Sequence, residues 1–225
     1  MAGQSLVCFL DVLGFARMVE VDASLDSPLY AANLEGVVSA IRGRAAKAGF
    51  EVHQFSDSIV IATTYSAAIV SCLVSVVCES QYLAVERHIL LRGGIALGQY
   101  TFSNGFLYSE ALVAAYRLEV QKARYPRVIV DENVVTLLRG TEPAALPQIK
   151  GSVLRDRDGA LFLDYLAGQD LTQHEAAVRK LMTDSDLSDV GIFEKYDWLV
   201  RYHNYVGAKQ GISAMDFGLA SIGEL

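Results

Sequence analysis

Two aspartates, Asp11 and Asp57, occupy positions where carboxylates could hold divalent cations. Asp11 directly follows the apolar run LVCFL at residues 6–10, which is typical of a buried central strand. Asp57 lies between two apolar segments that indicate the strands of a short hairpin. An isolated buried carboxylate is costly, whereas carboxylates on neighbouring strands can share a metal. A helix N-cap at Asp11 and an ordinary turn residue at Asp57 are the alternatives.

The segment VLGF at residues 12–15 comes directly after Asp11 and could meet a phosphate group. Gly14 is small enough to let backbone N–H groups approach phosphate oxygens closely. Glycine turns also follow many ordinary strands, so a simple turn is the alternative reading.

The hydrophobic pattern predicts an α+β fold. Strands are expected at residues 6–10, 50–55, 58–62, 89–98 and 128–130, with helices at 28–47, 67–86 and 109–122. This order indicates a ferredoxin-like βαββαβ core with an added αβ unit. A further hairpin is expected at 149–154 and 160–165, with helices from 171 onward. We expect a catalytic domain at 1–168 and a helical C-terminal extension at 169–225, packed on the core or on a dimer partner.

The composition indicates a folded chain with an acidic surface. The 225 residues are 52% hydrophobic and carry a net charge of −7, which argues against a general nucleic-acid binder. Cys8, Cys72 and Cys78 are odd in number and lack metal-ligand spacing, so we expect reduced core side chains in a cytoplasmic protein.

One uncharged stretch, residues 59–78, is about long enough to cross a membrane. Its β-branched beginning, the turn and cap residues at 63–66 and the apolar run that follows favour a strand and a buried helix. We expect no stable membrane insertion, and the N-terminus lacks the basic region of a signal peptide. An aromatic-rich stretch near the C-terminus indicates core or dimer contacts and contains Phe193, Tyr196, Trp198, Tyr202 and Tyr205.

Several motifs resemble those of the class III nucleotidyl cyclases and occur in the family's order between residues 6 and 165. FLDVLGF at 9–15 is similar to the first metal motif, and FSDS at 55–58 is similar to the second, with Ser56 where the family usually has Gly. LRGGIALG at 91–98 resembles the fourth-strand motif. AYRLE at 115–119 resembles the helix that supplies a transition-state arginine, and IKG at 149–151 resembles a late lysine motif.

The resemblance implies a head-to-tail homodimer with two active sites at its interface. Asp11, Val12 and Asp57 would bind two divalent cations, Mg²⁺ or Mn²⁺. Leu13, Gly14 and Phe15 would meet the substrate phosphates. Arg117 and Lys150 of the second protomer would neutralise charge on the α-phosphate and the leaving pyrophosphate. For Arg117 an ordinary surface helix residue is the alternative.

The departures from the family pattern concern the base and one catalytic position. Val113 stands where the family usually has a transition-state Asn, and His53 where adenylate cyclases carry an adenine-reading Lys. Phe50 begins the same strand as His53 and could narrow the site toward a smaller base. A core role is the alternative for both.

These features look most like the pyrimidine cyclases of bacterial anti-phage (Pycsar) systems, which make cyclic UMP or cyclic CMP as an alarm signal. The resemblance implies UTP as substrate, with CTP next. An adenylate or guanylate cyclase comes after these, and a non-catalytic nucleotide-binding module is the last alternative.

Overall fold

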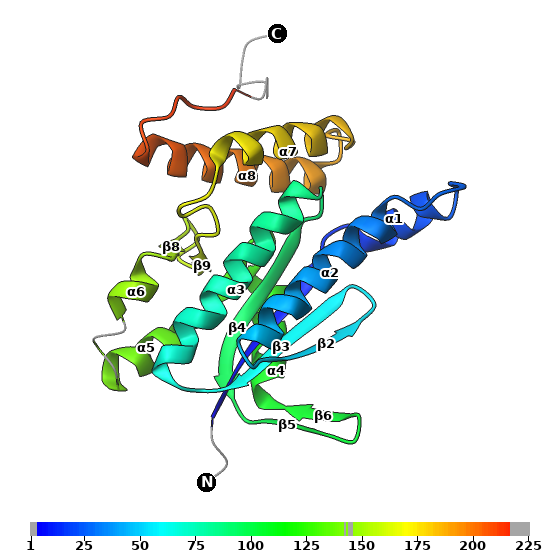
Figure 1. Ribbon diagram of the computed structural model, residues 1–225. Coiled ribbons are helices and arrows are strands. Elements are labelled where there is room, and N and C mark those ends of the chain that lie inside the picture. Colours follow the sequence, from blue (N-terminus) through cyan, green and yellow to red (C-terminus); the bar gives the residue numbers. More distant parts are fainter. Residues whose placement is uncertain (1–3, 142, 144–145, 217–225) are drawn as a thin grey trace.

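The computed structural model describes residues 4–141, 143 and 146–216 (Figure 1). Its centre is a seven-stranded mixed sheet in the order β2-β3-β1-β4-β7-β9-β8. The strands of this sheet are β1 (Ser5–Val12), β2 (Glu51–Phe55), β3 (Ser58–Thr64), β4 (Leu91–Gly98), β7 (Val128–Val130), β8 (Val153–Arg155) and β9 (Leu161–Leu163). A separate hairpin consists of β5 (Tyr100–Ser103) and β6 (Phe106–Ser109). The helices are α1 (Phe15–Asp22), α2 (Tyr30–Lys47), α3 (Ala67–Glu86), α4 (Glu110–Lys122), α5 (Glu132–Thr141), α6 (Leu146–Lys150), α7 (Leu171–Thr183) and α8 (Val190–Lys209).

The predicted α+β class and ferredoxin-like core are confirmed. Strands β2, β3, β1 and β4 pair in antiparallel fashion in this spatial order. Strand β7 then joins β4 in parallel after the crossover through α4, which is the added αβ unit. The sheet therefore places the ends of β1, β3 and β4 side by side.

The two faces of β1 pack against different layers. Leu6, Cys8 and Leu10 belong to the large core that also contains residues of α2 and α3, whereas Val7 and Phe9 lie on the opposite face with residues of α4. This is the two-residue alternation of a strand buried on both sides. Asp11 continues the series of Val7 and Phe9, so it belongs to the face that α4 covers.

A close approach of α4 to β4 depends on Gly94. A Cβ atom at this position would lie only 2.4 Å from the carbonyl oxygen of Ala115 in α4. Any side chain there would push α4 away from the sheet. Gly94 thus sets the depth at which α4 sits above the ends of β1 and β4.

The uncharged segment at 59–78 contributes a strand and a helix, as predicted. Ser66 caps α3 and its hydroxyl accepts a hydrogen bond from the N–H of Ile69 at 3.3 Å. Among the described residues, α3 is the one helix long and apolar enough to cross a membrane, and 56% of its most apolar stretch is buried inside the protein. All three cysteines are free; Cys8 is buried, and Cys72 and Cys78 are partly buried.

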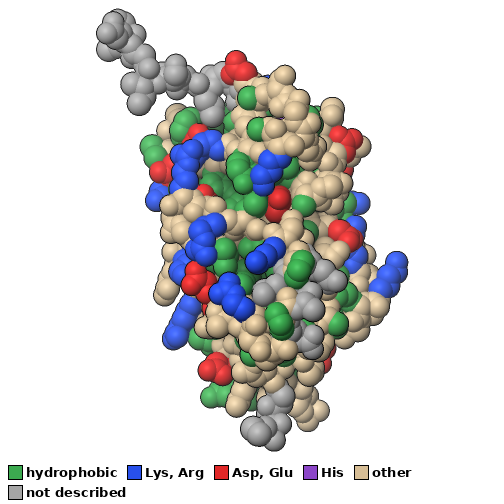
Figure 2. Space-filling view, turned by 90° about the vertical axis from the view of Figure 1, so that its left-hand side faces the viewer, with side chains coloured by type: hydrophobic (Ala, Val, Ile, Leu, Met, Phe, Trp, Pro, Cys, Tyr) green, Lys and Arg blue, Asp and Glu red, His purple; other side chains and the backbone are tan. Residues whose placement is uncertain are grey.

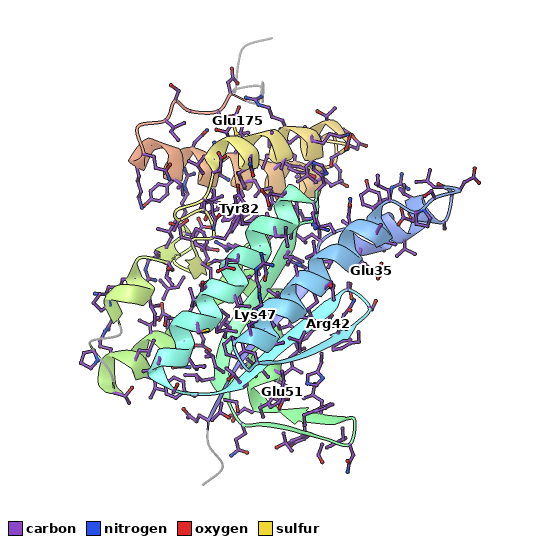
Figure 3. The ribbon with its side chains drawn as sticks, in the orientation of Figure 1. Glu35, Arg42, Lys47, Glu51, Tyr82 and Glu175 are labelled. Atoms are coloured by element: carbon purple, nitrogen blue, oxygen red, sulfur yellow. The ribbon has the colours of Figure 1, made fainter. Side chains whose placement is uncertain are left out.

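Helices α7 and α8 pack over the C-terminal end of α3. The Tyr82 hydroxyl in α3 donates a hydrogen bond to the Asp170 carbonyl at the start of α7 (2.8 Å; Figure 3). Tyr196, Trp198 and Tyr202 of the aromatic stretch are buried in the cluster between these helices and the sheet, whereas Tyr205 is 51% exposed. The domain boundary after residue 168 stays a prediction.

Three features of the chain differ from the sequence-based expectation. The strand expected from residue 149 begins only at Val153, because α6 occupies 146–150 and Pro147 suits the first turn of a helix. Helices α1 and α5 were not predicted. The hairpin β5–β6 was also missed, although its turn residues Asn104 and Gly105, both with positive φ, are a typical hairpin signal.

Candidate metal and nucleotide site

Backbone pairing brings the segments that carry Asp11 and Asp57 together. Asp11 pairs with Ser58 of β3 on one side and with Arg92 of β4 on the other. The N–H of Val12 donates a hydrogen bond to the carbonyl of Asp57 at 3.1 Å. The structure therefore brings together the two aspartates that the sequence singled out, at one end of neighbouring strands.

Arg92 and Glu119 complete a charged cluster around Asp11. The Arg92 Nε atom donates to Asp11 Oδ2 at 2.9 Å and also lies 2.8 Å from Glu119 Oε1. The Glu119 side chain is only 3% exposed. Its Oε1 atom is close to the guanidinium but accepts no aligned hydrogen bond among the described residues. This oxygen therefore keeps acceptor capacity for a further ligand.

Neither residue was assigned a site role from the sequence, although both lie within quoted motifs. Arg92 belongs to LRGG and Glu119 to AYRLE. Their charge could have identified them, because Arg92 lies in an apolar motif and Glu119 in a helical one, and a buried charge requires a partner. Which partner each one takes depends on contacts between β1, β4 and α4.

The electrostatics of the cluster favour an additional cation. Burial raises the pKa of Asp11, Arg92 opposes this, and the nearby Asp57 raises the pKa further. Burial also raises the pKa of Glu119; Arg92 again lowers it, and Asp11 and Asp57 raise it. When ionised, three carboxylates against one guanidinium leave a local charge of −2 (−3 + 1). A divalent cation would balance this charge.

The donor set fits the predicted Mg²⁺ or Mn²⁺, which prefer oxygen ligands. Val12 is buried in the core, so only its carbonyl could take part. The described residues contain no ready-made cluster of three or more His, Cys, Asp or Glu ligands. Asp11 and Asp57 would thus hold metal together with water and substrate oxygens, the usual arrangement for Mg²⁺.

The turn after β1 has the backbone shape expected of a phosphate-binding turn. Gly14 is left-handed, with φ of 78°, and stands as the N-cap of α1 without any side-chain capping bond. The first N–H groups of a helix have no acceptor within the helix, so they can bind an anion. The N–H of Leu13 is already bonded to the Leu90 carbonyl at 2.9 Å, which leaves Gly14 and Phe15 as the better candidates.

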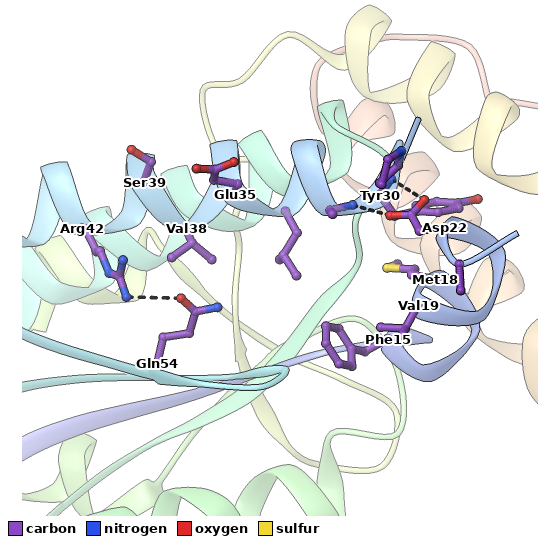
Figure 4. Close-up of a pocket in the computed structure, with 14 residues that line it drawn as sticks. Phe15, Met18, Val19, Asp22, Tyr30, Glu35, Val38, Ser39, Arg42 and Gln54 are labelled. Atoms are coloured by element: carbon purple, nitrogen blue, oxygen red, sulfur yellow. Dashed lines mark hydrogen bonds between the residues drawn. The ribbon is translucent and has the colours of Figure 1, made fainter. Parts of the chain in front are cut away.

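The Phe15 side chain is not placed to contact a phosphate at this turn. It packs against the large core and lines an open groove of about 660 Å³ between α1, α2 and β2. Figure 4 shows this groove, with Arg42 of α2 hydrogen-bonded to Gln54 of β2 at 3.2 Å. Only the backbone of Phe15 is therefore placed to face a phosphate.

The structure separates Phe50 from His53. Phe50 is 6% exposed and belongs to the core beneath α2 and α3. His53 packs instead against Phe102 of the β5–β6 hairpin, with ring centroids 4.1 Å apart. Its Nε2 atom is buried and, within the described part of the chain, accepts or donates no hydrogen bond. The expectation that Phe50 narrows the site is therefore not supported by its position, and Phe102 is the aromatic ring beside His53.

Arg117 and Lys150 lie away from the aspartates of their own chain. Arg117 is exposed on the outer side of α4, whereas Ala115 and Glu119 of the same helix face the sheet. Lys150 is exposed at the end of α6. No hydrogen bond or ion pair joins either side chain to Asp11 or Asp57 in the described structure. Their predicted catalytic roles would need a second protomer.

No protein-family model matches this chain, and no curated protein matches it in sequence. Solved structures do resemble it. The chain is similar in fold to nucleotidyl cyclase domains. The adenylyl cyclase CyaB from P. aeruginosa shares 13% identity over 72% of this chain and 93% of its own, with a TM-score of 0.48. The catalytic core of a rhodopsin-guanylyl cyclase with converted specificity shares 13% sequence identity over 72% of this chain and 96% of its own, with a TM-score of 0.49.

A bacterial light-regulated adenylyl cyclase is a third such structure, with 14% identity over 80% of this chain and 98% of its own and a TM-score of 0.45. At this degree of identity and superposition, the similarities do not define a substrate or an activity for this chain. The chemistry must come from the site itself.

Proposed function

We propose that this protein is a metal-dependent pyrimidine nucleotide cyclase that converts UTP to cyclic UMP and pyrophosphate. One observation carries the proposal. The carboxylates of Asp11 and Glu119 contact a single guanidinium, that of Arg92, and Asp57 lies near enough to raise the pKa of both, which leaves a charge of −2 when all three are ionised, close to the left-handed Gly14 turn. Excess negative charge can bind metal cations, and backbone N–H groups without an acceptor can bind phosphate oxygens. A site with both features suits a metal-bound triphosphate.

Each residue of the cluster has a definite task in this reaction. Asp11 and Asp57 would hold two divalent cations, which lower the pKa of the ribose 3′-OH and neutralise phosphate charge. The backbone N–H groups after Gly14 orient the triphosphate. Arg92 fixes the Asp11 carboxylate in place through its hydrogen bond, and Glu119 in turn holds Arg92. The 3′-OH would release its proton to water, its oxygen would attack the α-phosphorus, and the bond from that phosphorus to the leaving pyrophosphate would break.

A homodimer would complete the site. Large apolar side chains are exposed on the outer side of α4 and on the β5–β6 hairpin, among them Phe102, Phe106, Tyr108, Val113, Tyr116 and Val120. Such a group of exposed apolar residues marks an interaction surface. Arg117 lies within it, so the same contact that buries these residues would deliver Arg117 to the partner's phosphates.

The contact between His53 and Phe102 supports a pyrimidine. Phe102 fills space beside the strand position from which a base would be read, which favours the smaller ring. The Nε2 atom of His53 lies 3.5 Å from Glu51 Oε2 without an aligned hydrogen bond, so it could form one with a carbonyl or ring nitrogen of the base. CTP is the next candidate, and adenylate or guanylate cyclisation follows it. The role as a second-messenger enzyme in anti-phage defence belongs to this proposal and rests on the motif resemblance.

Incubation of the protein with Mn²⁺ and each of the four nucleoside triphosphates tests the proposal. Cyclic UMP should be the main product, measured by mass spectrometry. Cyclic AMP or cyclic GMP as the main product would refute the pyrimidine assignment. A lack of product from every triphosphate, with binding retained, would favour the non-catalytic module that Val113 leaves as an alternative.

A further inference from the structure

A second, smaller pocket lies at the other edge of the sheet. It has a volume of about 290 Å³ between the β8–β9 hairpin and α8, and it is lined by three arginines, four aromatic residues and Leu154 and Asp156. Strand β8 forms the sheet edge opposite β2, so β1, β4, β7 and β9 separate this pocket from the β2–β3 turn with Asp57. Nothing in the proposed cyclase reaction uses it.

The walls of the pocket carry positive charge. Arg155 and Arg157 come from the hairpin and Arg201 from α8. Arg155 and Arg201 make exposed ion pairs with Glu132 at 3.3 Å and Asp197 at 2.5 Å, which are weak in water. Within the described part of the chain, the Arg157 side chain has no hydrogen-bond or ion-pair partner. Figure 2 shows this face of the molecule, where Lys and Arg side chains gather around hollows with hydrophobic floors.

The one acid in the pocket does not neutralise these arginines. Asp156 forms an ion pair with Arg127, which is only 1% exposed, and accepts a hydrogen bond from Trp198 Nε1 at 2.7 Å. The backbone N–H of Arg157 donates a hydrogen bond to the other carboxylate oxygen of Asp156 at 2.7 Å. Asp156 is therefore bound within the protein. Of the three arginines that line the pocket, Arg155 is bonded to Glu132 and the Gly159 carbonyl and Arg201 to Asp197, which leaves Arg157 as the one with no such bond in the described chain.

The floor and one side of the pocket are aromatic. Trp198, Phe162 and Tyr202 are buried and pack against one another, with ring centroids 5.2–5.5 Å apart. Tyr205 is half exposed, and the ammonium of Lys209 lies 4.3 Å from the centre of its ring. Trp198, Arg201 and Tyr205 follow one another at helical spacings along the same side of α8.

We infer that this pocket binds a nucleoside monophosphate or a nucleotide of similar size. Arginine forks bind phosphate oxygens in bidentate fashion, and Tyr205, the exposed aromatic ring of the pocket, can stack on a planar base. The volume of about 290 Å³ lies just below the ~300–1,000 Å³ found for small-molecule pockets, which fits one nucleotide better than a chain of them. The inference concerns binding alone, and it holds whether or not the Asp11 site is a cyclase.

Trp198 is the single tryptophan of the chain, so its fluorescence reports on this pocket directly. UMP and AMP are titrated in EDTA, where a metal-dependent site is not loaded, and isothermal titration calorimetry supplies a second readout. We expect saturable binding that alters the Trp198 emission. Uridine or inorganic phosphate alone should bind about tenfold or more weakly, because each meets only the aromatic or only the cationic half.

Variants locate the binding. Arg157→Gln and Arg201→Gln should each raise the dissociation constant about tenfold, whereas Arg44→Gln on α2 should not change it. Asp57→Asn should bind UMP like the unchanged protein. Loss of binding in Asp57→Asn would place the nucleotide at the metal site and overturn the inference. The same holds for a lack of heat and fluorescence change with either nucleotide, for unchanged binding in both arginine variants, or for tighter binding of a uridine octanucleotide.

Discussion

The guanidinium of Arg92 on β4 lies 2.9 Å from the carboxylate of Asp11, its direct cross-strand neighbour on β1. This pair fixes one of the two predicted metal ligands before any metal binds. Glu119 approaches the same Nε atom from α4, so the three elements that surround the site meet at one charge cluster. Stability and function are therefore coupled at Arg92.

Replacing Arg92 should expose this coupling. Arg92→Gln leaves two largely buried carboxylates without their cation, and we expect the free energy of unfolding to fall by about 2–4 kcal/mol at pH 7. Because burial raises the pKa of Glu119, this carboxyl takes up a proton more readily as the pH falls, so the loss should be smaller at pH 5 than at pH 7. Urea denaturation at both pH values measures this. Arg44→Gln removes the exposed pair with Glu79 and should cost less than about 1 kcal/mol. Equal losses in the two variants would contradict the account.

A composite site predicts recovery of activity between two inactive proteins. Asp57→Ala should abolish turnover without unfolding the chain, because it removes a half-exposed carboxylate at a turn rather than core volume. Arg117→Ala should also be inactive. Mixing them creates one site with both residues intact, so up to about one quarter of the activity should return if subunits exchange at random. Subunit exchange is verified with differently labelled protomers, and no recovery despite exchange would rule out a shared site.

Gly94 should be intolerant of a single methyl group. In Gly94→Ala the new Cβ would meet the Ala115 carbonyl at 2.4 Å, and we expect destabilisation of about 1–3 kcal/mol together with a displaced α4. Gly43→Ala is the matched control, because a Cβ there meets nothing within 4 Å on an exposed helix side. This control should stabilise the protein by about 0.5–1 kcal/mol. Thermal unfolding of both variants decides the matter, and similar melting temperatures would contradict the close-packing role.

A buried histidine pair in the C-terminal helices should make stability depend on pH. The Nδ1 atoms of His174 and His203 are 3.0 Å apart, and Tyr165 contacts the other side of His174 at 3.1 Å. Burial and the neighbouring His203 lower the pKa of His174 to about 3. The folded state thus keeps His174 neutral, whereas the unfolded chain takes up a proton below its ordinary pKa of 6.5.

The contribution of His174 to stability is therefore complete above pH 6.5 and is lost as the pH falls toward 3. The loss amounts to about 2 kcal/mol at pH 5. Glu175 and Arg179 act on the pKa of His203 in opposite directions. Denaturation curves between pH 7.5 and 5 should show this slope, and His174→Gln should flatten it. His88→Asn, at a partly exposed position with positive φ that Asn tolerates, should keep the full slope.

Local patterns were enough to predict strands β1 and β3 and the aspartates near one end of each, although β1 extends to Val12 and includes Asp11 and β3 extends to Thr64. An uninterrupted apolar run can satisfy its side chains only inside a sheet, so Asp11 had to stand at the end of a buried strand. The opposite orientations of Phe50 and His53 could also have been predicted. Their positions differ by an odd number, and strand alternation places such residues on different faces.

The sequence by itself determined which acids stand beside the Gly14 turn, because hydrophobic runs, turns and caps depend on neighbouring residues. Only the tertiary structure decided which positively charged side chain contacts Asp11. The pairing of β1 with β4 brings Arg92 to Asp11, and the close approach of α4 that Gly94 permits brings Glu119 to the same guanidinium. The same holds for the arginine pocket, where a hairpin and a helix about 40 residues apart share one cavity. Contacts between residues of distant elements depend on how those elements pack, and local sequence patterns do not determine this packing.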